Sequence, residues 1–139
     1  MPDTLAAELE DLSAEFEILG DWEERYRHII DLGRQLEPLD DAERTEANKV
    51  RGCASQVWLV TDKQADGRIV FKGDSDAHIV RGLVAIVLRL YSGRPREQIL
   101  GFDAKSAFAE LGLAGALSAQ RSNGLASMVD RIRRDAEAA

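Results

Sequence analysis

Cys53 is the only cysteine of the chain and the residue best suited to covalent chemistry. It follows Gly52 and shortly precedes residues 56–62, an apolar and β-branched run that predicts a β-strand. Because glycine permits a tight turn, we expect the thiol to lie at a corner of the backbone beside a rigid element. Arg51 next to it would favour the thiolate, which is the reactive form of cysteine. These features favour a reactive thiol over the common alternative, a buried structural cysteine.

The number of cysteines restricts the chemistry of this thiol. A thiol–disulfide oxidoreductase usually requires a second, resolving thiol, and the chain has none. An iron–sulfur scaffold requires several thiolate ligands, and a structural zinc site requires four ligands. Besides Cys53, the sequence offers only His28 and His78 as soft ligands. We therefore predict that the chain has no metal site.

Two kinds of covalent chemistry suit a lone thiol. A cysteine hydrolase needs a histidine beside the thiol, and His78, close to Asp74 and Asp76, is a better candidate than His28, which we expect to be solvated. No catalytic signature surrounds Cys53, which weakens the hydrolase hypothesis. A sulfur carrier needs only one thiolate, which attacks the terminal sulfur of another protein's persulfide. Without a second cysteine, the new persulfide cannot collapse into an internal disulfide and waits for an external acceptor.

The composition is that of an acidic globular protein. The chain has 139 residues, which fits a single domain over 1–139, and it carries 25 acidic and 18 basic side chains for a net charge of -7. Such a charge repels nucleic acid unless the basic residues cluster. The longest apolar run, residues 83–88, is too short to span a bilayer, and residues 1–4 lack the features of a signal peptide. We predict a cytoplasmic protein that binds neither nucleic acid nor membranes.

Apolar residues at helical spacing predict two helices in the first part of the chain. The first helix is expected to follow a cap at Asp3 or Thr4. The second begins at a capping box, in which Asp21 is the N-cap and Glu24 lies three residues later. The chain therefore starts with a pair of helices before the cysteine segment.

The middle of the chain predicts a small antiparallel sheet. Residues 56–62 and 68–72 read as two strands, and Asp66-Gly67 between them is typical of a tight hairpin turn. Val50 is expected on a short third strand. Residues 73–76 are expected to leave the sheet and to provide the N-cap of the helix that follows.

The rest of the chain is predicted to be helical. Residues 77–92 are apolar on most faces, which favours a central helix laid across the sheet. Four shorter segments follow: a short helix after Pro95, a helix over 103–111 capped by Asp103, an apolar link over 113–117 and a final helix that begins after Ser122 or Asn123. The predicted fold is α+β, with a small antiparallel sheet of about three strands packed against N-terminal and C-terminal helices.

The segment around Cys53 has the pattern Asn48-x-Val50-x-Gly52-Cys53-x-Ser55-x-Val57-Trp58-Leu59. This pattern closely resembles the active-cysteine segment of the SufE family of sulfur acceptors. Further blocks resemble the family in the same order: Trp22-x-x-Arg25-Tyr26, Phe71-x-Gly73-Asp74-Ser75-Asp76-Ala77, Gly82-Leu83, Phe102-Asp103, Leu111-Gly112-Leu113, Leu117-Ser118, and Arg121-x-Asn123-Gly124-Leu125 with Met128. Each block is weak alone, but together with the sole cysteine they make the resemblance specific.

The resemblance implies a fold, a function and partners. SufE-like proteins bind a pyridoxal-phosphate-dependent cysteine desulfurase of the SufS or CsdA kind, accept its persulfide sulfur and raise its turnover. They pass the sulfur to an iron–sulfur assembly scaffold of the SufBCD kind or, in a CsdE-like branch, to another sulfur-using pathway. The pyridoxal phosphate belongs to the desulfurase, so this chain is expected to hold no cofactor. The fold resembles that of the scaffold protein IscU, whose cluster-ligand cysteines are missing here.

The resemblance also assigns roles to four residues. Cys53 matches the persulfide-bearing cysteine. Asp76 and Arg121 match positions tied to placement of the cysteine loop and to desulfurase contact, although a helix N-cap would explain Asp76 and a surface ion pair would explain Arg121. Gly52 is explained by a tight turn, to which the resemblance adds mobility of the loop. A non-covalent activator of a desulfurase stays open as an alternative to the sulfur carrier.

Overall fold

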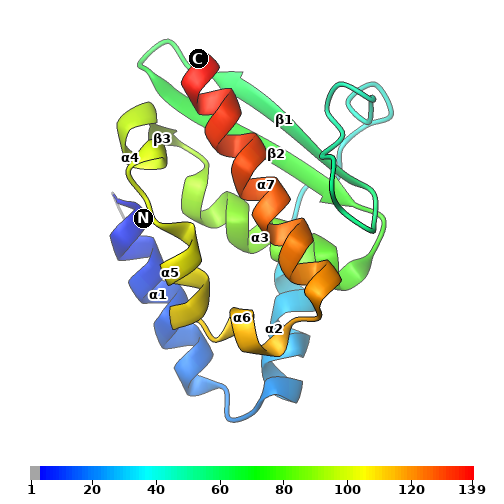
Figure 1. Ribbon diagram of the computed structural model, residues 1–139, viewed down its shortest axis with the longest axis vertical. Helices are drawn as coiled ribbons and strands as arrows, with labels where there is room; N and C mark the ends of the chain where they lie inside the picture. The colour runs from blue at the N-terminus through cyan, green and yellow to red at the C-terminus, as the bar shows by residue number, and fades with distance from the viewer. Residues whose placement is uncertain (1–3) are drawn as a thin grey trace.

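A computed structural model describes residues 4–139 and confirms the α+β class. Figure 1 shows the course of the chain through ten elements. Their order is α1 (Leu5–Ile18), α2 (Trp22–Arg34), β1 (Val57–Lys63), β2 (Arg68–Ser75), α3 (His78–Tyr91), β3 (Arg94–Pro95), α4 (Arg96–Leu100), α5 (Ala104–Glu110), α6 (Leu113–Ala116) and α7 (Ala119–Ala138).

The first two helices begin at the caps that the sequence predicts. The side chain of Thr4 accepts a hydrogen bond from the backbone N–H of Ala7, and Asp21 accepts one from Glu24. Asp3, the alternative cap of the first helix, lies outside the described residues. The carboxylate of Glu24 accepts a hydrogen bond from the backbone N–H of Gly20 at 2.9 Å, which completes a variant of the capping box.

The sheet has three antiparallel strands in the order β1-β2-β3. Its third strand is β3, not the segment around Val50, which was predicted for this role. That segment forms an isolated bridge from Lys49 to Trp58 on the outer side of β1. The prediction that residues 73–76 leave the sheet is also wrong, because β2 continues to Ser75, which pairs with Val57.

Gly73 explains why β2 runs further than its apolar residues suggest. A Cβ at this position would lie 2.7 Å from the side chain of Val84 and 2.9 Å from that of Leu59. The strand therefore passes α3 at a distance that only glycine allows. A glycine read as the exit from the sheet is in fact the point where helix and strand approach most closely.

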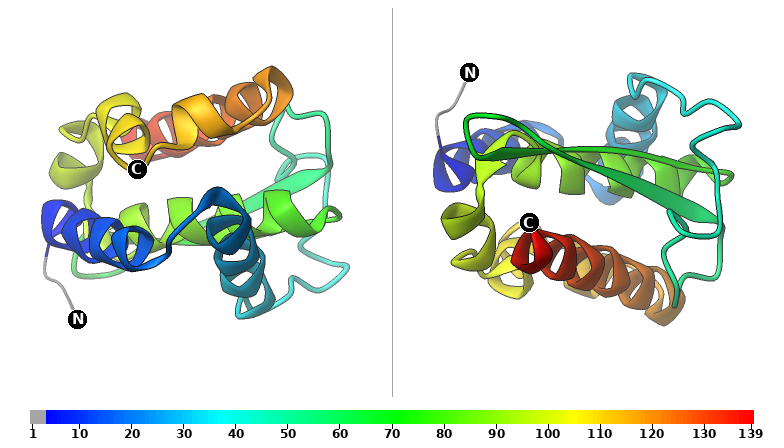
Figure 2. Two further views of the ribbon diagram at one scale, coloured as in Figure 1. Left: turned by 90° about the horizontal axis from the view of Figure 1, so that it is seen from below. Right: turned by 90° about the horizontal axis from the view of Figure 1, so that it is seen from above.

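The helix α3 is the centre of the core, as the sequence predicts. Its buried side chains include Leu83, Val84, Ile86, Val87, Leu88, Leu90 and Tyr91. The helix α2 packs closely against it, because a Cβ on Gly33 would come within 2.7 Å of the backbone nitrogen of Gly82. Figure 2 shows α5, α6 and α7 as a layer over α3 and the sheet.

The helix α7 starts earlier than predicted. Its N-cap is Ser118, whose hydroxyl accepts a hydrogen bond from the backbone N–H of Arg121 at 3.3 Å. Ser122 and Asn123, the predicted starting points, therefore lie inside the helix. The predicted apolar link before it contains the short helix α6. The buried face of α7 is formed by Leu125, Met128, Val129 and Ile132.

Candidate functional site: a thiol held between a hairpin loop and a helix

Cys53 lies in a loop that closes a short hairpin. The backbone N–H of Val50 donates to the carbonyl of Val57, and that of Leu59 donates to the carbonyl of Asn48, both at 2.8 Å. The residues enclosed by the inner rung, between Val50 and Val57, form the cysteine loop, which we define as residues 51–56. The rungs anchor the ends of the loop to β1, so the thiol is carried on a short arm from a rigid strand.

Gly52 makes the turn of the cysteine loop. Its φ is +90°, in the region that favours glycine, as a tight turn requires. A Cβ at this position would lie 2.5 Å from Oγ of Ser127 on α7. Glycine is therefore required at position 52 for two reasons: its φ is positive, and its backbone lies too close to α7 for a side chain.

The thiol of Cys53 faces α7 and is half-buried. Its Sγ lies 3.6 Å from the carbonyl oxygen of Gly124, a contact within reach of a weak S–H hydrogen bond. Burial raises the pKa of the Cys53 thiol. The expectation that Arg51 stabilises the thiolate is wrong, because its side chain is 80% exposed and pairs with Glu46 at 3.5 Å. The resting site therefore favours the neutral thiol.

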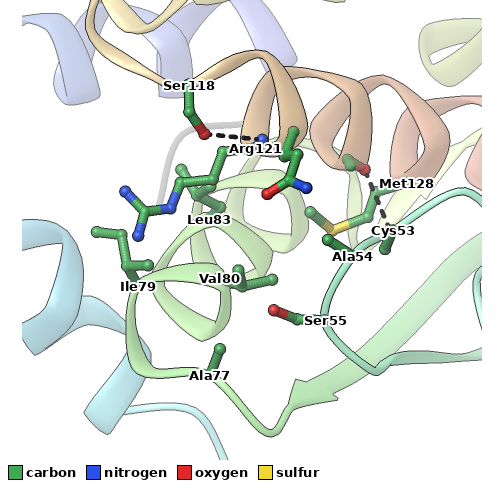
Figure 3. A pocket seen from close by; sticks show the side chains of 12 residues that line it. Cys53, Ala54, Ser55, Ala77, Ile79, Val80, Leu83, Ser118, Arg121 and Met128 are labelled. Carbon is green, nitrogen blue, oxygen red and sulfur yellow. Dashed lines mark hydrogen bonds between the residues drawn. The ribbon is translucent and has the colours of Figure 1, made fainter.

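A pocket of about 320 Å³ opens beside the thiol. One wall comes from the cysteine loop, one from the start of α3 and one from the first half of α7 (Figure 3). Its apolar side chains are Ile79, Val80, Leu83 and Met128, and its polar ones are Ser55, Ser118, Gln120 and Arg121. The sulfur of Cys53 thus borders a small space lined by both apolar and polar side chains, of which Arg121 is exposed.

Asp76 fixes the downstream end of the cysteine loop. Its Oδ1 accepts a hydrogen bond from the backbone N–H of Gln56 at 3.1 Å, and its own N–H donates to the carbonyl of Gln56 at 3.3 Å. The expected N-cap role is wrong, because Ala77 occupies the N-cap position of α3 and forms no side-chain cap. The carboxylate therefore holds the loop and not the helix.

Arg121 lies on the other side of the pocket from Cys53. Figure 3 shows its side chain extending towards Ile79. The surface ion pair that would explain it is not formed with any residue between 4 and 139. An exposed cation at the rim of the pocket is thus available to a group outside the chain.

The two histidines lie apart from the thiol. His78 begins α3 but does not line the pocket of Cys53. His28 was expected to be solvated, and this is wrong, because its Nε2 lies 3.0 Å from a carboxylate oxygen of Glu15 and its ring packs edge-on against Phe16. The geometry lacks a histidine beside the cysteine, which a hydrolase would need. Over residues 4–139, no cluster of three or more His, Cys, Asp or Glu side chains is arranged to hold a metal ion.

Comparisons with known proteins give the class of this fold and site. The family model SufE, described as an Fe–S metabolism associated domain, matches residues 10–136. An uncharacterized SufE-like protein of Rhizobium etli is 54% identical over 134 residues, which are 94% of this chain and 90% of the relative. One of Rhizobium meliloti is 49% identical over 132 residues, covering 93% and 94% of the two chains. The chain belongs to the SufE family.

A solved structure supports the fold independently. The solution structure of a hypothetical protein from Thermus thermophilus superimposes with a TM-score of 0.76 at 17% identity, covering 94% of this chain and 93% of that one. Family membership indicates a role in sulfur transfer associated with a cysteine desulfurase. None of the helices within residues 4–139 is long and apolar enough to cross a membrane.

Several residues of the site were not identified from the sequence. Gly124 and Ser127 form the surface of α7 under the cysteine loop, and Arg131 contacts the segment that leads into it. The one available signal was Gly124, because a glycine inside a helix lowers helix stability by about 1 kcal/mol relative to alanine and so suggests a close contact at that position. Nothing in the sequence pairs α7 with a segment more than 70 residues earlier.

Proposed function

We propose that the protein is a sulfur acceptor that takes persulfide sulfur from a pyridoxal-phosphate-dependent cysteine desulfurase onto Cys53. The observation that carries the proposal is a lone thiol on a glycine-hinged loop beside a small pocket, in a chain of the SufE family. A single thiolate suffices for this chemistry, and a second thiol would compete with the external acceptor.

The transfer is an exchange between two sulfur–sulfur bonds. Cys53 loses its proton, and its thiolate attacks the terminal sulfur of the donor's persulfide. A new bond forms between the two sulfurs, the donor's own S–S bond breaks, and the donor cysteine leaves as a thiolate that takes up a proton. The sulfane sulfur moves with no net oxidation or reduction. Transfer to an acceptor follows the same chemistry: the acceptor's thiolate attacks the terminal sulfur, and Cys53 leaves as a thiolate.

The resting position of Cys53 suits storage better than attack. Burial raises the pKa of the thiol, so fewer thiolates are present at neutral pH, and both oxidation and unwanted exchange are slowed. When the loop moves away from Gly124 into water, the cause of the raised pKa is removed. Opening therefore exposes the sulfur and increases its thiolate fraction in one motion.

Three neighbours of the thiol would control this motion. Gly52 permits the change of backbone direction, and Asp76 holds the end of the loop that stays in place. Arg121 offers a charge to the partner at the rim of the pocket. We propose that docking on the desulfurase draws the loop outward and that Arg121 contributes to that docking and to stimulation of the enzyme.

The proposed destination of the sulfur is iron–sulfur cluster assembly through a SufBCD-like scaffold in the cytoplasm. The description of the matching family as associated with Fe–S metabolism supports this choice. A CsdE-like carrier for another sulfur-using pathway is the alternative. A further alternative is an activator that stimulates the desulfurase by binding alone, without accepting sulfur.

One experiment separates these functions. The protein is mixed with a SufS-like desulfurase and cysteine, and its intact mass is measured without reductant. We expect the mass of added sulfur on the wild-type chain and none on Cys53→Ser, which also loses stimulation of the enzyme. Full stimulation by Cys53→Ser would establish the non-covalent activator instead. His78→Ala should accept sulfur normally, since that histidine does not line the pocket.

A further inference from the structure

The segment that leads into the cysteine loop is held by Arg131 of α7. Its residues 46–48 form turns, in which the N–H of Asn48 donates to the carbonyl of Thr45 and that of Lys49 to the carbonyl of Glu46. Lys49 then forms an isolated bridge with Trp58 of β1. Arg131 donates to two carbonyls of this segment, from Nη2 to Ala47 at 2.7 Å and from Nη1 to Lys49 at 3.1 Å. Its guanidinium thus ties the turn and the bridge residue to α7.

The guanidinium is itself fixed by a second contact. Its Nε donates to the carboxylate of Asp135 at 3.1 Å, one helical turn further along α7. Thr61 of β1 donates its hydroxyl to the same carboxylate at 2.7 Å. The side chains of Arg131 and Asp135 are only 15% and 21% exposed, so water competes weakly for these bonds. We call these contacts the Arg131 clamp.

The clamp lies on the same face of α7 as the residues that touch the loop. Gly124, Ser127 and Arg131 are spaced by three and four positions, which places them in one row along a helix. Gly124 contacts the thiol of Cys53, and Ser127 lies beneath Gly52. The row therefore supports the thiol, the turn at Gly52 and the segment before them with a single helix.

We propose that Arg131 is a positioning residue for Cys53: it fixes the segment 47–49 so that the closed loop holds the thiol against α7. The inference rests on the proposed function, since closure matters when the thiol carries sulfur. With the upstream end held by Arg131 and the downstream end by Asp76, motion is confined to the loop between them. Without the clamp, the upstream segment moves with the loop and the thiol is exposed more often.

Arg131→Gln tests this role, and Arg133→Gln is its matched control. Arg133 lies on the same helix and also donates to two backbone carbonyls, those of Leu100 at 3.1 Å and Phe102 at 3.5 Å. Those carbonyls belong to the last residue of α4 and to the connection between α4 and α5, and not to the cysteine segment. Both variants should lose stability towards urea, and Arg131→Gln should lose more, because it gives up its ion pair with Asp135 besides two charged hydrogen bonds to backbone carbonyls.

The two variants should differ in the alkylation rate of Cys53 by iodoacetamide. We expect Arg131→Gln to react faster by on the order of tenfold, the effect of losing charged hydrogen bonds from the closed state alone. Arg133→Gln should react at the wild-type rate. Arg131→Lys should lie between wild type and Arg131→Gln, because an ammonium lacks the planar fork that reaches both carbonyls.

A wild-type alkylation rate in Arg131→Gln would overturn the proposal, and so would an equal acceleration in Arg133→Gln. If Arg131→Gln does not fold, Arg131→Lys and Asp135→Asn supply the same comparison. Sulfur acceptance from the desulfurase is measured separately by intact mass. A wild-type chain that gains no sulfur would refute the proposed function, whereas the alkylation rates alone decide the role of Arg131.

Discussion

Replacing Gly52 with alanine should open the cysteine loop. The residue has a φ of +90°, and alanine in the left-handed region costs about 1–2 kcal/mol. The new methyl group would also lie 2.5 Å from Oγ of Ser127. The serine side chain can rotate away from it, so we assign this overlap about 1 kcal/mol, the low end of the range for overpacking. The closed loop should therefore lose about 2–3 kcal/mol relative to open forms, which corresponds to about a 30- to 150-fold change in their ratio.

The assay is alkylation of Cys53 by iodoacetamide under native conditions, together with urea unfolding. Gly67→Ala is the control, since Gly67 has a φ of +92°, meets nothing within 4 Å and lies in the turn between β1 and β2. Both variants should lose stability, but only Gly52→Ala should react faster. Adding Ser127→Ala to Gly52→Ala should recover the part due to steric overlap and leave the part due to φ.

An unchanged alkylation rate in Gly52→Ala would refute this reasoning. It would mean that closure of the loop does not depend on the glycine, or that the thiol is equally accessible in the closed state. Faster alkylation in Gly67→Ala would also refute it, because the effect would then follow from general destabilisation. If Gly52→Ala and the double variant with Ser127→Ala are alkylated equally fast, the whole effect comes from the backbone angle at residue 52.

Three further predictions use the same measurements. Asp76→Asn retains an acceptor for the N–H of Gln56 but loses its charge, so the closed state should weaken by about 1 kcal/mol and alkylation should quicken about fivefold. Because burial raises the pKa of Cys53, its alkylation should reach half-maximum at a higher pH than that of the urea-unfolded chain, and Gly52→Ala should shift this midpoint downward. Asp74→Asn should cost about 2 kcal/mol of unfolding free energy at neutral pH, because it removes the charge of a buried carboxylate that binds Arg44, whose own side chain is 36% exposed. Burial alone would raise the pKa of Asp74, but hydrogen bonds from Arg44 and from backbone N–H groups outweigh this effect and lower that pKa. The ionised Asp74 should therefore stabilise the fold above its unfolded pKa, and this stabilisation should disappear as the pH falls through its folded pKa. In Asp74→Asn, the free energy of unfolding in urea should accordingly fall less steeply with decreasing pH across that range.

The predictions that succeeded concern short stretches of chain. The N-caps at Thr4, Asp21 and Asp103 depend on a side chain and a backbone N–H three residues away, so local sequence suffices to find them. The central helix α3 was recognised because apolar residues on most of its faces require burial. The sequence also predicts the turn at Gly52 and the resemblance to the SufE family, because both depend on residues that are close together in the sequence.

The predictions that failed needed knowledge of distant partners. Asp76 looks like a cap because it precedes a helix, yet its carboxylate binds the N–H of Gln56, 20 positions earlier. Val50 is expected in a short third strand, but its segment only bridges β1, and the third strand is formed by Arg94 and Pro95 beside β2. The acceptors of Arg131 lie more than 80 positions earlier in the chain, so no neighbouring residue indicates them. Such pairings are set by the packing of α7 on the rest of the fold, which no local pattern encodes.

The arrangement around Cys53 explains how one thiol can be both sheltered and released at small cost. The bond that holds the sulfur itself is weak, a 3.6 Å contact to the carbonyl of Gly124. The stronger contacts are made by the charged side chains of Asp76 and Arg131, and they hold the two ends of the loop, not the thiol. A partner that binds the loop then needs to displace only the weak contact, while the charged anchors keep the opened loop in register with β1. A stronger bond to the sulfur would protect it equally well, but the partner would have to break that bond at every transfer. Weaker hydrogen bonds from Asp76 and Arg131 would let the loop open and expose the thiol without a partner.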